Sequence, residues 1–126
     1  KDEYKLIEGN PQIKSKIKEK QRQLSLRRMM AEVPSADVII TNPTHFAIAV
    51  KYEEAVSEAP VVIAKGKDLI AEKIKDTAKK NNVPIVENKP LAQALYKSVE
   101  IGQQIPSELY KAVAEVLAYV YSLKDK

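Results

Sequence analysis

Four short runs of β-branched and other apolar residues alternate with helical segments between residues 34 and 126. The strand-like runs are 37–41, 46–52, 61–64 and 84–86. The helical segments are 68–80, 90–99 and a last one that begins at Ser107, with Asp68 and Ser107 as expected caps. Strands that alternate with helices in this order predict an α/β fold. We expect a small four-stranded mixed sheet surrounded by about four helices.

The segment before this domain carries the basic excess of the chain. Asn10-Pro11 is typical of a helix start, and no further glycine or proline occurs before Pro34. Residues 11–32 contain seven basic and two acidic residues, an excess of +5, whereas residues 33–126 contain equal numbers of each. Its apolar side is narrow, so we expect a basic helix over 11–31 that buries little surface. The predicted organisation is a basic linker helix, 1–33, followed by a compact domain, 34–126.

The composition excludes several kinds of chemistry. The chain has no cysteine and one histidine, so it offers no disulfide, no thiolate nucleophile and no histidine-rich metal site. We therefore expect no metal and no cofactor. Charged residues interrupt every apolar run, so no segment is expected to span a bilayer. The chain starts at Lys1 without a signal-peptide pattern, and we interpret it as part of a longer protein.

The tetrapeptide Asn42-Pro43-Thr44-His45 separates the first two predicted strands. One interpretation is an ordinary turn, since Asn-Pro commonly interrupts strands. The other is chemical. Pro43 has no backbone N–H that could attack the Asn42 side chain, so the usual route of asparagine deamidation is blocked. The side-chain amide of Asn42 can instead attack its own backbone carbonyl, form a succinimide and expel the Pro43 nitrogen, which cuts the chain. The tertiary amide before proline twists more readily than a secondary one, which favours this route.

Thr44 and His45 are the candidate supporting residues of such a cut. The His45 imidazole can accept and release protons near neutral pH, and Thr44 can orient the loop by hydrogen bonding. A partly buried His45 that only fixes the turn is the alternative.

The same tetrapeptide between two apolar strands resembles the self-cleaving motif of the export-switch family of type III secretion, most of all its flagellar branch. The resemblance extends over almost the whole chain. It includes Gly9-Asn10-Pro11, 36–41, Ala64-Lys65-Gly66, 84–88, Pro90-Leu91-Ala92, Ala94-Leu95-Tyr96, Glu100-Ile101-Gly102, Ile105-Pro106, Glu108-Leu109-Tyr110 and 114–121. Several motifs in the same order carry more weight than the tetrapeptide alone.

The resemblance implies the cytosolic domain of an inner-membrane protein, at the cytoplasmic face of the bacterial inner membrane. It implies a cut between Asn42 and Pro43, made once per molecule rather than by enzymatic turnover, with the two pieces staying together. Asn42 would cyclise, Pro43 would become the new N-terminus, and Thr44 and His45 would support the reaction. The cut would let the export apparatus change from rod and hook proteins to filament proteins. The implied partners are a hook-length control protein, export substrates and other components of the export gate.

Three alternatives remain open from the sequence. The chain could be the equivalent switch protein of a virulence-type injectisome. It could be a docking module that is not cut, in which Asn42-Pro43 is only a turn. Nucleic-acid binding is disfavoured, because the basic helix lacks interleaved aromatic residues and the domain is electrically neutral.

The basic helix could contact anionic lipid or could be a solvated face. The residues expected at a lipid surface are Lys14, Lys16, Lys18, Lys20 and Arg22.

Overall fold

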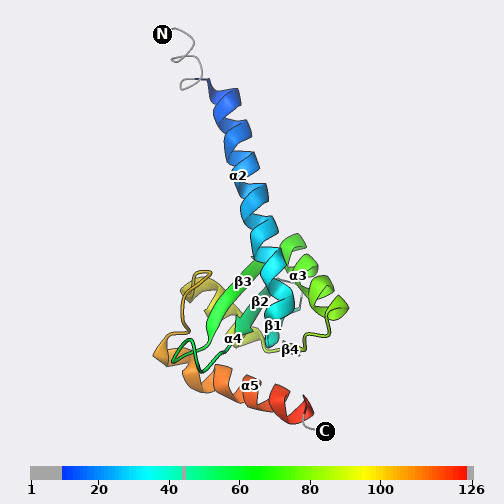
Figure 1. Cartoon of the computed structure of the whole chain (residues 1–126), viewed down its shortest axis with the longest axis vertical. Helices are drawn as coiled ribbons and strands as arrows, with labels where there is room; N and C mark the ends of the chain where they lie inside the picture. The colour runs from blue at the N-terminus through cyan, green and yellow to red at the C-terminus, as the bar shows by residue number, and fades with distance from the viewer. Residues whose placement is uncertain (1–9, 44, 125–126) are drawn as a thin grey trace.

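The computed structural model describes residues 10–43 and 45–124, and it contains one four-stranded sheet (Figure 1). The strands are β1 (Val38–Asn42), β2 (Phe46–Lys51), β3 (Val61–Lys67) and β4 (Ile85–Glu87), in the order β3-β2-β1-β4. β1 pairs with β2 antiparallel and with β4 parallel, and β2 pairs with β3 antiparallel. The predicted mixed sheet is therefore confirmed, and β1 is an interior strand.

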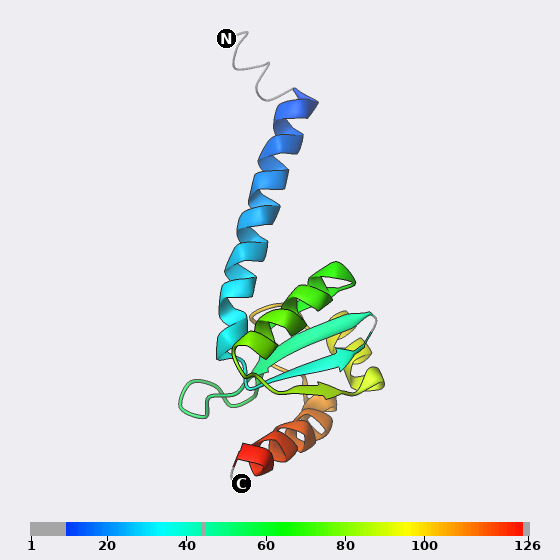
Figure 2. The same ribbon diagram turned by 90° about the vertical axis from the view of Figure 1, so that its right-hand side faces the viewer.

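Helices cover both faces of this sheet. In the described residues the α-helices are α2 (Pro11–Glu32), α3 (Leu69–Lys80), α4 (Lys89–Ser98) and α5 (Tyr110–Lys124). Short 3₁₀ turns at Val33–Ser35 and Ser107–Leu109 follow α2 and precede α5. α4 and α5 lie on one face and α3 lies on the other, beside the end of α2 (Figures 1 and 2). The predicted α/β architecture is confirmed.

Alternation along β1 and β2 divides the core between the two faces. Ile40 and Ile48 face α4 and α5 in one apolar cluster, whereas Ile39, Ala47 and Ala49 face α3 in another. On β2 the α3 side thus has alanines, whereas the other side has Ile48 and Val50. This lets α3 approach the sheet closely.

A bulge in β3 continues this arrangement. Ala49 pairs with Ala64 and Val50 with Val62, so the pairing skips Ile63. The extra residue moves Val62 to the α5 face and leaves Ala64 on the α3 face. Gly66 follows on the same side, where an added Cβ atom would overlap the Cγ2 atom of Ile70. β3 therefore offers α3 a surface without side-chain bulk.

The basic helix α2 begins as predicted and projects away from the sheet for most of its length (Figure 1). Asn10 caps it, since its Oδ1 atom accepts the N–H groups of Gln12 and Ile13 at 2.9 and 3.4 Å. Only Met29 is buried within the helix. The expectation of a helix with a thin apolar side is confirmed. Residues 1–9 of the predicted linker lie outside the described residues, and the division into linker and domain stays a prediction.

Two expected helix caps do not make a side-chain capping hydrogen bond. Asp68 precedes α3, but its φ of 53° and ψ of −117° differ from the extended backbone of a capping residue, and its side chain accepts no first-turn N–H. The physical reason is the sharp reversal between β3 and α3, which Asp68 itself makes. Ser107 begins a 3₁₀ turn and its hydroxyl donates to Glu108, so it does not cap α5.

Candidate functional site: the turn between β1 and β2

Asn42 and His45 close a tight turn at the end of the β1–β2 hairpin. The backbone N–H of His45 donates to the backbone carbonyl oxygen of Asn42 at 2.8 Å. This bond defines a four-residue β-turn, and Pro43 occupies the second position, where its locked φ is favoured. Thr44 lies outside the described residues, and its supporting role stays a prediction. The acceptor of this hydrogen bond is the carbonyl of the predicted scissile peptide.

The Asn42 side chain is shielded from water. Asn42 lies opposite Phe46 in the β1–β2 ladder, so their side chains share the face that α4 covers. Phe46 stacks on Tyr96 of α4, with ring centroids 4.5 Å apart. Only 4% of Asn42 is exposed. The amide is therefore confined between the strand ends and α4.

His45 is held by its backbone, and its residue is exposed. Its N–H binds Asn42, and its carbonyl oxygen accepts the N–H of Asp68 at 3.0 Å. The alternative of a partly buried His45 is wrong, because the residue is exposed. The contribution of His45 to the turn comes from its two backbone hydrogen bonds.

Lys75 contacts the turn from the other face of the sheet, and the sequence analysis did not identify it. Its Nζ atom donates to the carbonyl oxygen of Pro43 at 2.9 Å and lies 2.9 Å from the carboxylate of Glu72 on the same helix. Its side chain is 16% exposed. No local pattern indicates this contact, because the two partners are 32 residues apart in the chain.

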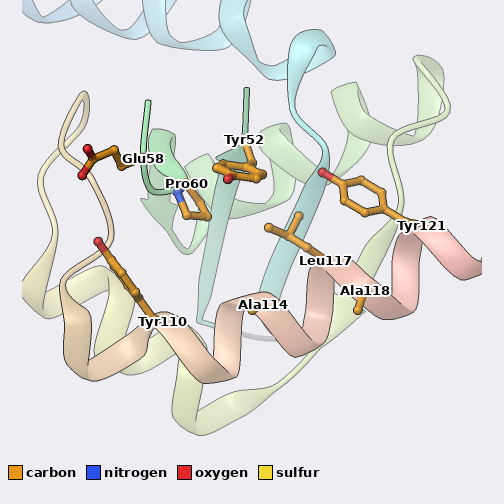
Figure 3. A pocket seen from close by; sticks show the side chains of 8 residues that line it. All are labelled: Tyr52, Glu58, Pro60, Tyr110, Ala114, Leu117, Ala118 and Tyr121. Carbon is orange, nitrogen blue, oxygen red and sulfur yellow. The ribbon is translucent and has the colours of Figure 1, made fainter. Parts of the chain in front are cut away.

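A second feature is an apolar groove of about 330 Å³ between α5 and the segment after β2. Figure 3 shows its lining, with Tyr110 and Glu58 at one end and Tyr121 at the other. The remaining lining residues are Tyr52, Pro60, Ala114, Leu117 and Ala118. Burial raises the pKa of the Tyr121 hydroxyl, and the Asp37 carboxylate adds to this shift.

The helix α5 carries three tyrosines, Tyr110, Tyr119 and Tyr121, and all three are exposed. The helix buries Val113, Val116, Leu117 and Val120 instead. Two of the three tyrosines line the groove, which sequence periodicity alone did not reveal.

Neither a metal site nor a membrane span is found in the part of the chain that the structure describes. Within residues 10–43 and 45–124, no three His, Asp or Glu side chains are grouped closely enough to hold a metal ion. None of the helices in those ranges combines the length and the hydropathy that crossing a bilayer requires.

The fold and the hairpin turn define a small α/β domain with an asparagine–proline bond presented at a strand end. The model of the FlhB HrpN YscU SpaS family matches residues 1–120, and the chain belongs to this family. It is 60% identical over 126 residues to the flagellar biosynthetic protein FlhB of Bacillus subtilis, covering 100% of this chain and 35% of that protein. The chain thus spans about a third of the length of such relatives.

Solved structures agree with this assignment. The cytoplasmic domain of FlhB from Shewanella putrefaciens is 55% identical, with a TM-score of 0.76, over 79% of this chain and 76% of that one. An EscU C-terminal domain in which an asparagine is replaced by alanine is 33% identical, with a TM-score of 0.71, over 73% of this chain and 92% of that one. The greater identity to FlhB confirms the resemblance to the flagellar branch.

Proposed function

We propose that this chain is a self-cleaving part of a flagellar type III export apparatus, cut between Asn42 and Pro43. The cut would change the export specificity from rod and hook proteins to filament proteins. The observation that carries the proposal is the turn itself. A buried asparagine is followed by proline, and a backbone N–H already binds the carbonyl oxygen that the reaction must polarise.

The reaction needs no group from outside the chain except water. The Nδ2 atom of Asn42 attacks the backbone carbonyl carbon of Asn42 and forms a new C–N bond, which closes a five-membered succinimide. The bond from that carbon to the Pro43 nitrogen breaks, and the proton released from Nδ2 goes to the Pro43 nitrogen. The first piece ends in a cyclic imide, which water later opens. Each molecule reacts once, so the chain is not an enzyme in the usual sense.

The folded turn supplies two kinds of help. Negative charge develops on the Asn42 carbonyl oxygen, and the His45 N–H at 2.8 Å is already directed at it. The burial of Asn42 limits the positions of its amide, which raises the chance of a productive approach. A rate on the order of 10⁻³ s⁻¹ corresponds to a barrier of about 21 kcal/mol. Each ~1.4 kcal/mol by which the turn lowers this barrier raises the cleavage rate tenfold. The exposed His45 imidazole can carry the transferred proton.

The sheet order implies that the pieces stay together after the cut. β1 belongs to the first piece, and both of its neighbours, β2 and β4, belong to the second. All five residues of β1 are buried, so separation would expose an interior strand. We expect native gel filtration to show one species where a denaturing gel shows two.

The proposal includes a location at the cytoplasmic face of the bacterial inner membrane, with α2 nearest the lipid. The five basic residues Lys14, Lys16, Lys18, Lys20 and Arg22 are exposed, which suits contact with anionic headgroups. Flotation with vesicles of phosphatidylglycerol tests this. Replacing Lys14, Lys16, Lys18 and Lys20 by Glu should abolish flotation, and unchanged flotation would contradict the contact.

Mass spectrometry of the purified, denatured chain tests the cleavage. We expect a piece that ends at Asn42, lighter by one water than the free acid before hydrolysis, and a piece that begins with Pro43. The Asn42→Ala variant should give one intact mass and an unchanged circular dichroism spectrum. A folded wild-type chain that stays intact after long incubation would contradict the proposal, as would cleavage of the variant.

The groove on α5 favours a second candidate function, the docking of an export substrate through a short apolar segment. Its lining is mostly apolar and offers tyrosine rings, a combination common at binding sites for peptides. Ala114→Glu places a charge in the groove, and Ser122→Glu places the same charge on α5 outside the lining. We expect the first change to weaken binding of an export substrate and the second to leave it unchanged. Equal effects would contradict a role for the groove, and neither result bears on the cleavage.

A further inference from the structure

Lys75 binds the first carbonyl group beyond the proposed cut. Its ammonium group donates to the Pro43 oxygen at 2.9 Å, from a helix that follows β3 in the chain. Glu72, one turn earlier on α3, holds the same ammonium group at 2.9 Å. With 16% of its side chain exposed, Lys75 is more enclosed than a surface lysine, and charge-assisted hydrogen bonds of this kind are strong.

The position of α3 fixes where this ammonium group lies. Ala71, Ile74 and Ala78 bury one side of α3 against the sheet. Gly66 lets Ile70 approach β3 closely. Lys75 directly follows the buried Ile74, so its stem starts from an anchored part of the helix. The contact with Pro43 therefore rests on packing of the whole helix and not on the lysine alone.

The Lys75 contact and the His45 N–H together restrain the backbone on both sides of the scissile peptide bond. The ring of Pro43 locks its φ, and the Lys75 bond to its carbonyl oxygen restrains its ψ. On the other side of the scissile bond, the His45 N–H holds the Asn42 carbonyl oxygen. The leaving nitrogen thus lies between two carbonyl groups that are both held in place.

We propose that Lys75, held by Glu72, is a positioning residue for the cleavage, because it fixes the orientation of Pro43 relative to the Asn42 carbonyl. The inference rests on the proposed self-cleavage and adds a residue to it. Lys75 acts through Pro43 and touches none of the atoms whose bonds change. A loss of this bond lets Pro43 rotate about ψ, so the productive geometry is reached less often.

The test measures the cleavage rate of the 126-residue chain after cell-free synthesis, by pulse-chase and denaturing gels. We expect Lys75→Met to slow the cut by roughly tenfold to a hundredfold, the range of a lost charged hydrogen bond. Lys75→Arg should recover most of the rate, because a guanidinium group can also donate to the Pro43 oxygen. Lys79→Met, an exposed lysine on the same helix, is the matched control and should cut at the wild-type rate.

Folding is checked separately from cleavage. Each change is also made together with Asn42→Ala, and thermal unfolding of these uncut chains shows the effect on the fold alone. Glu72→Gln is the second variant, which keeps the lysine and should slow the cut less than Lys75→Met. Lys75→Met at the wild-type rate in a folded chain would overturn the inference, as would Lys75→Arg no faster than Lys75→Met. Should Lys75→Met fail to fold, a wild-type rate for Glu72→Gln would overturn it. A wild-type chain that is never cut would contradict the proposed function instead.

Discussion

The two ends of β2 differ in how they are held. At its start, the backbone of His45 accepts from Asp68 and donates to Asn42 across the turn. The Lys75 ammonium group donates to the Pro43 carbonyl oxygen of the same turn. At its other end, the connection from Glu53 to Pro60 leads into an apolar groove lined by tyrosines. In Figure 2 the connection from Glu53 to Pro60 lies at the end of the sheet opposite the β1–β2 hairpin. The first end is held by specific hydrogen bonds, and the second is the proposed docking site.

The proposed cleavage and the proposed docking of a partner therefore depend on different residues of one small sheet. α3 supports the turn, whereas α5 supplies the groove. A change on the α3 face should therefore affect the cut and leave the groove intact.

Pro43→Ala should redirect the chemistry of the turn. The alanine restores a backbone N–H, which can attack the Asn42 side chain and cause deamidation with the chain intact. We expect the cleavage rate to fall by on the order of a hundredfold or more, since a hundredfold change corresponds to only about 2.7 kcal/mol in the barrier. A mass increase of the deamidated, uncut chain should accompany this loss. Rapid cleavage of this variant without deamidation would show that proline is not needed.

Gly66→Ala should destabilise the α3 face and slow the cut. The new methyl group would overlap Ile70, so α3 must move, at a cost of about 1–3 kcal/mol in the free energy of unfolding. Because Lys75 moves with α3, cleavage should slow as well, while binding at the groove stays unchanged. Gly102→Ala is the control for strain without overlap. Its φ of 91° strains an added side chain, but no atom lies within 4 Å of the added Cβ atom. Urea unfolding and cleavage rates measure both effects, and an unaltered cleavage rate in Gly66→Ala would break the link between α3 and the turn.

Asp68→Gly should stabilise the chain slightly. The backbone of Asp68 has a φ of 53°, a conformation that costs a non-glycine residue about 1 kcal/mol or more. Glycine removes this strain but gains freedom in the unfolded state, so we expect a net gain below about 1 kcal/mol. The hydrogen bond from the Asp68 N–H to the His45 carbonyl oxygen is kept. The cleavage rate should therefore stay within about twofold of the wild-type rate, since a tenfold effect would need a ~1.4 kcal/mol change in the barrier. A lower melting temperature would show that the Asp68 side chain stabilises the corner.

Local patterns predicted the elements, because each strand and helix has its own periodicity and its own start and stop signals. Asn10-Pro11 marked the start of α2 correctly, and the breakers around 42–45 marked the hairpin. The bulge at Ile63 and the positive φ of Asp68 escaped prediction, since both depend on how β3 must meet α3. The Lys75 contact and the groove join segments far apart in the chain, so no local pattern could reveal them. For the site, the sequence indicated which residues could react but not what holds them.

We propose that the fold, and not the dipeptide alone, makes the Asn42–Pro43 bond break. The most direct test follows the uncut chain after synthesis in two conditions, in buffer where it folds and in urea where it stays unfolded. We expect cleavage to proceed in the folded chain and to be slower by at least about a hundredfold in urea, where the His45 hydrogen bond and the burial of Asn42 are lost. Equal rates in the two conditions, or no cleavage of the folded chain, would contradict it.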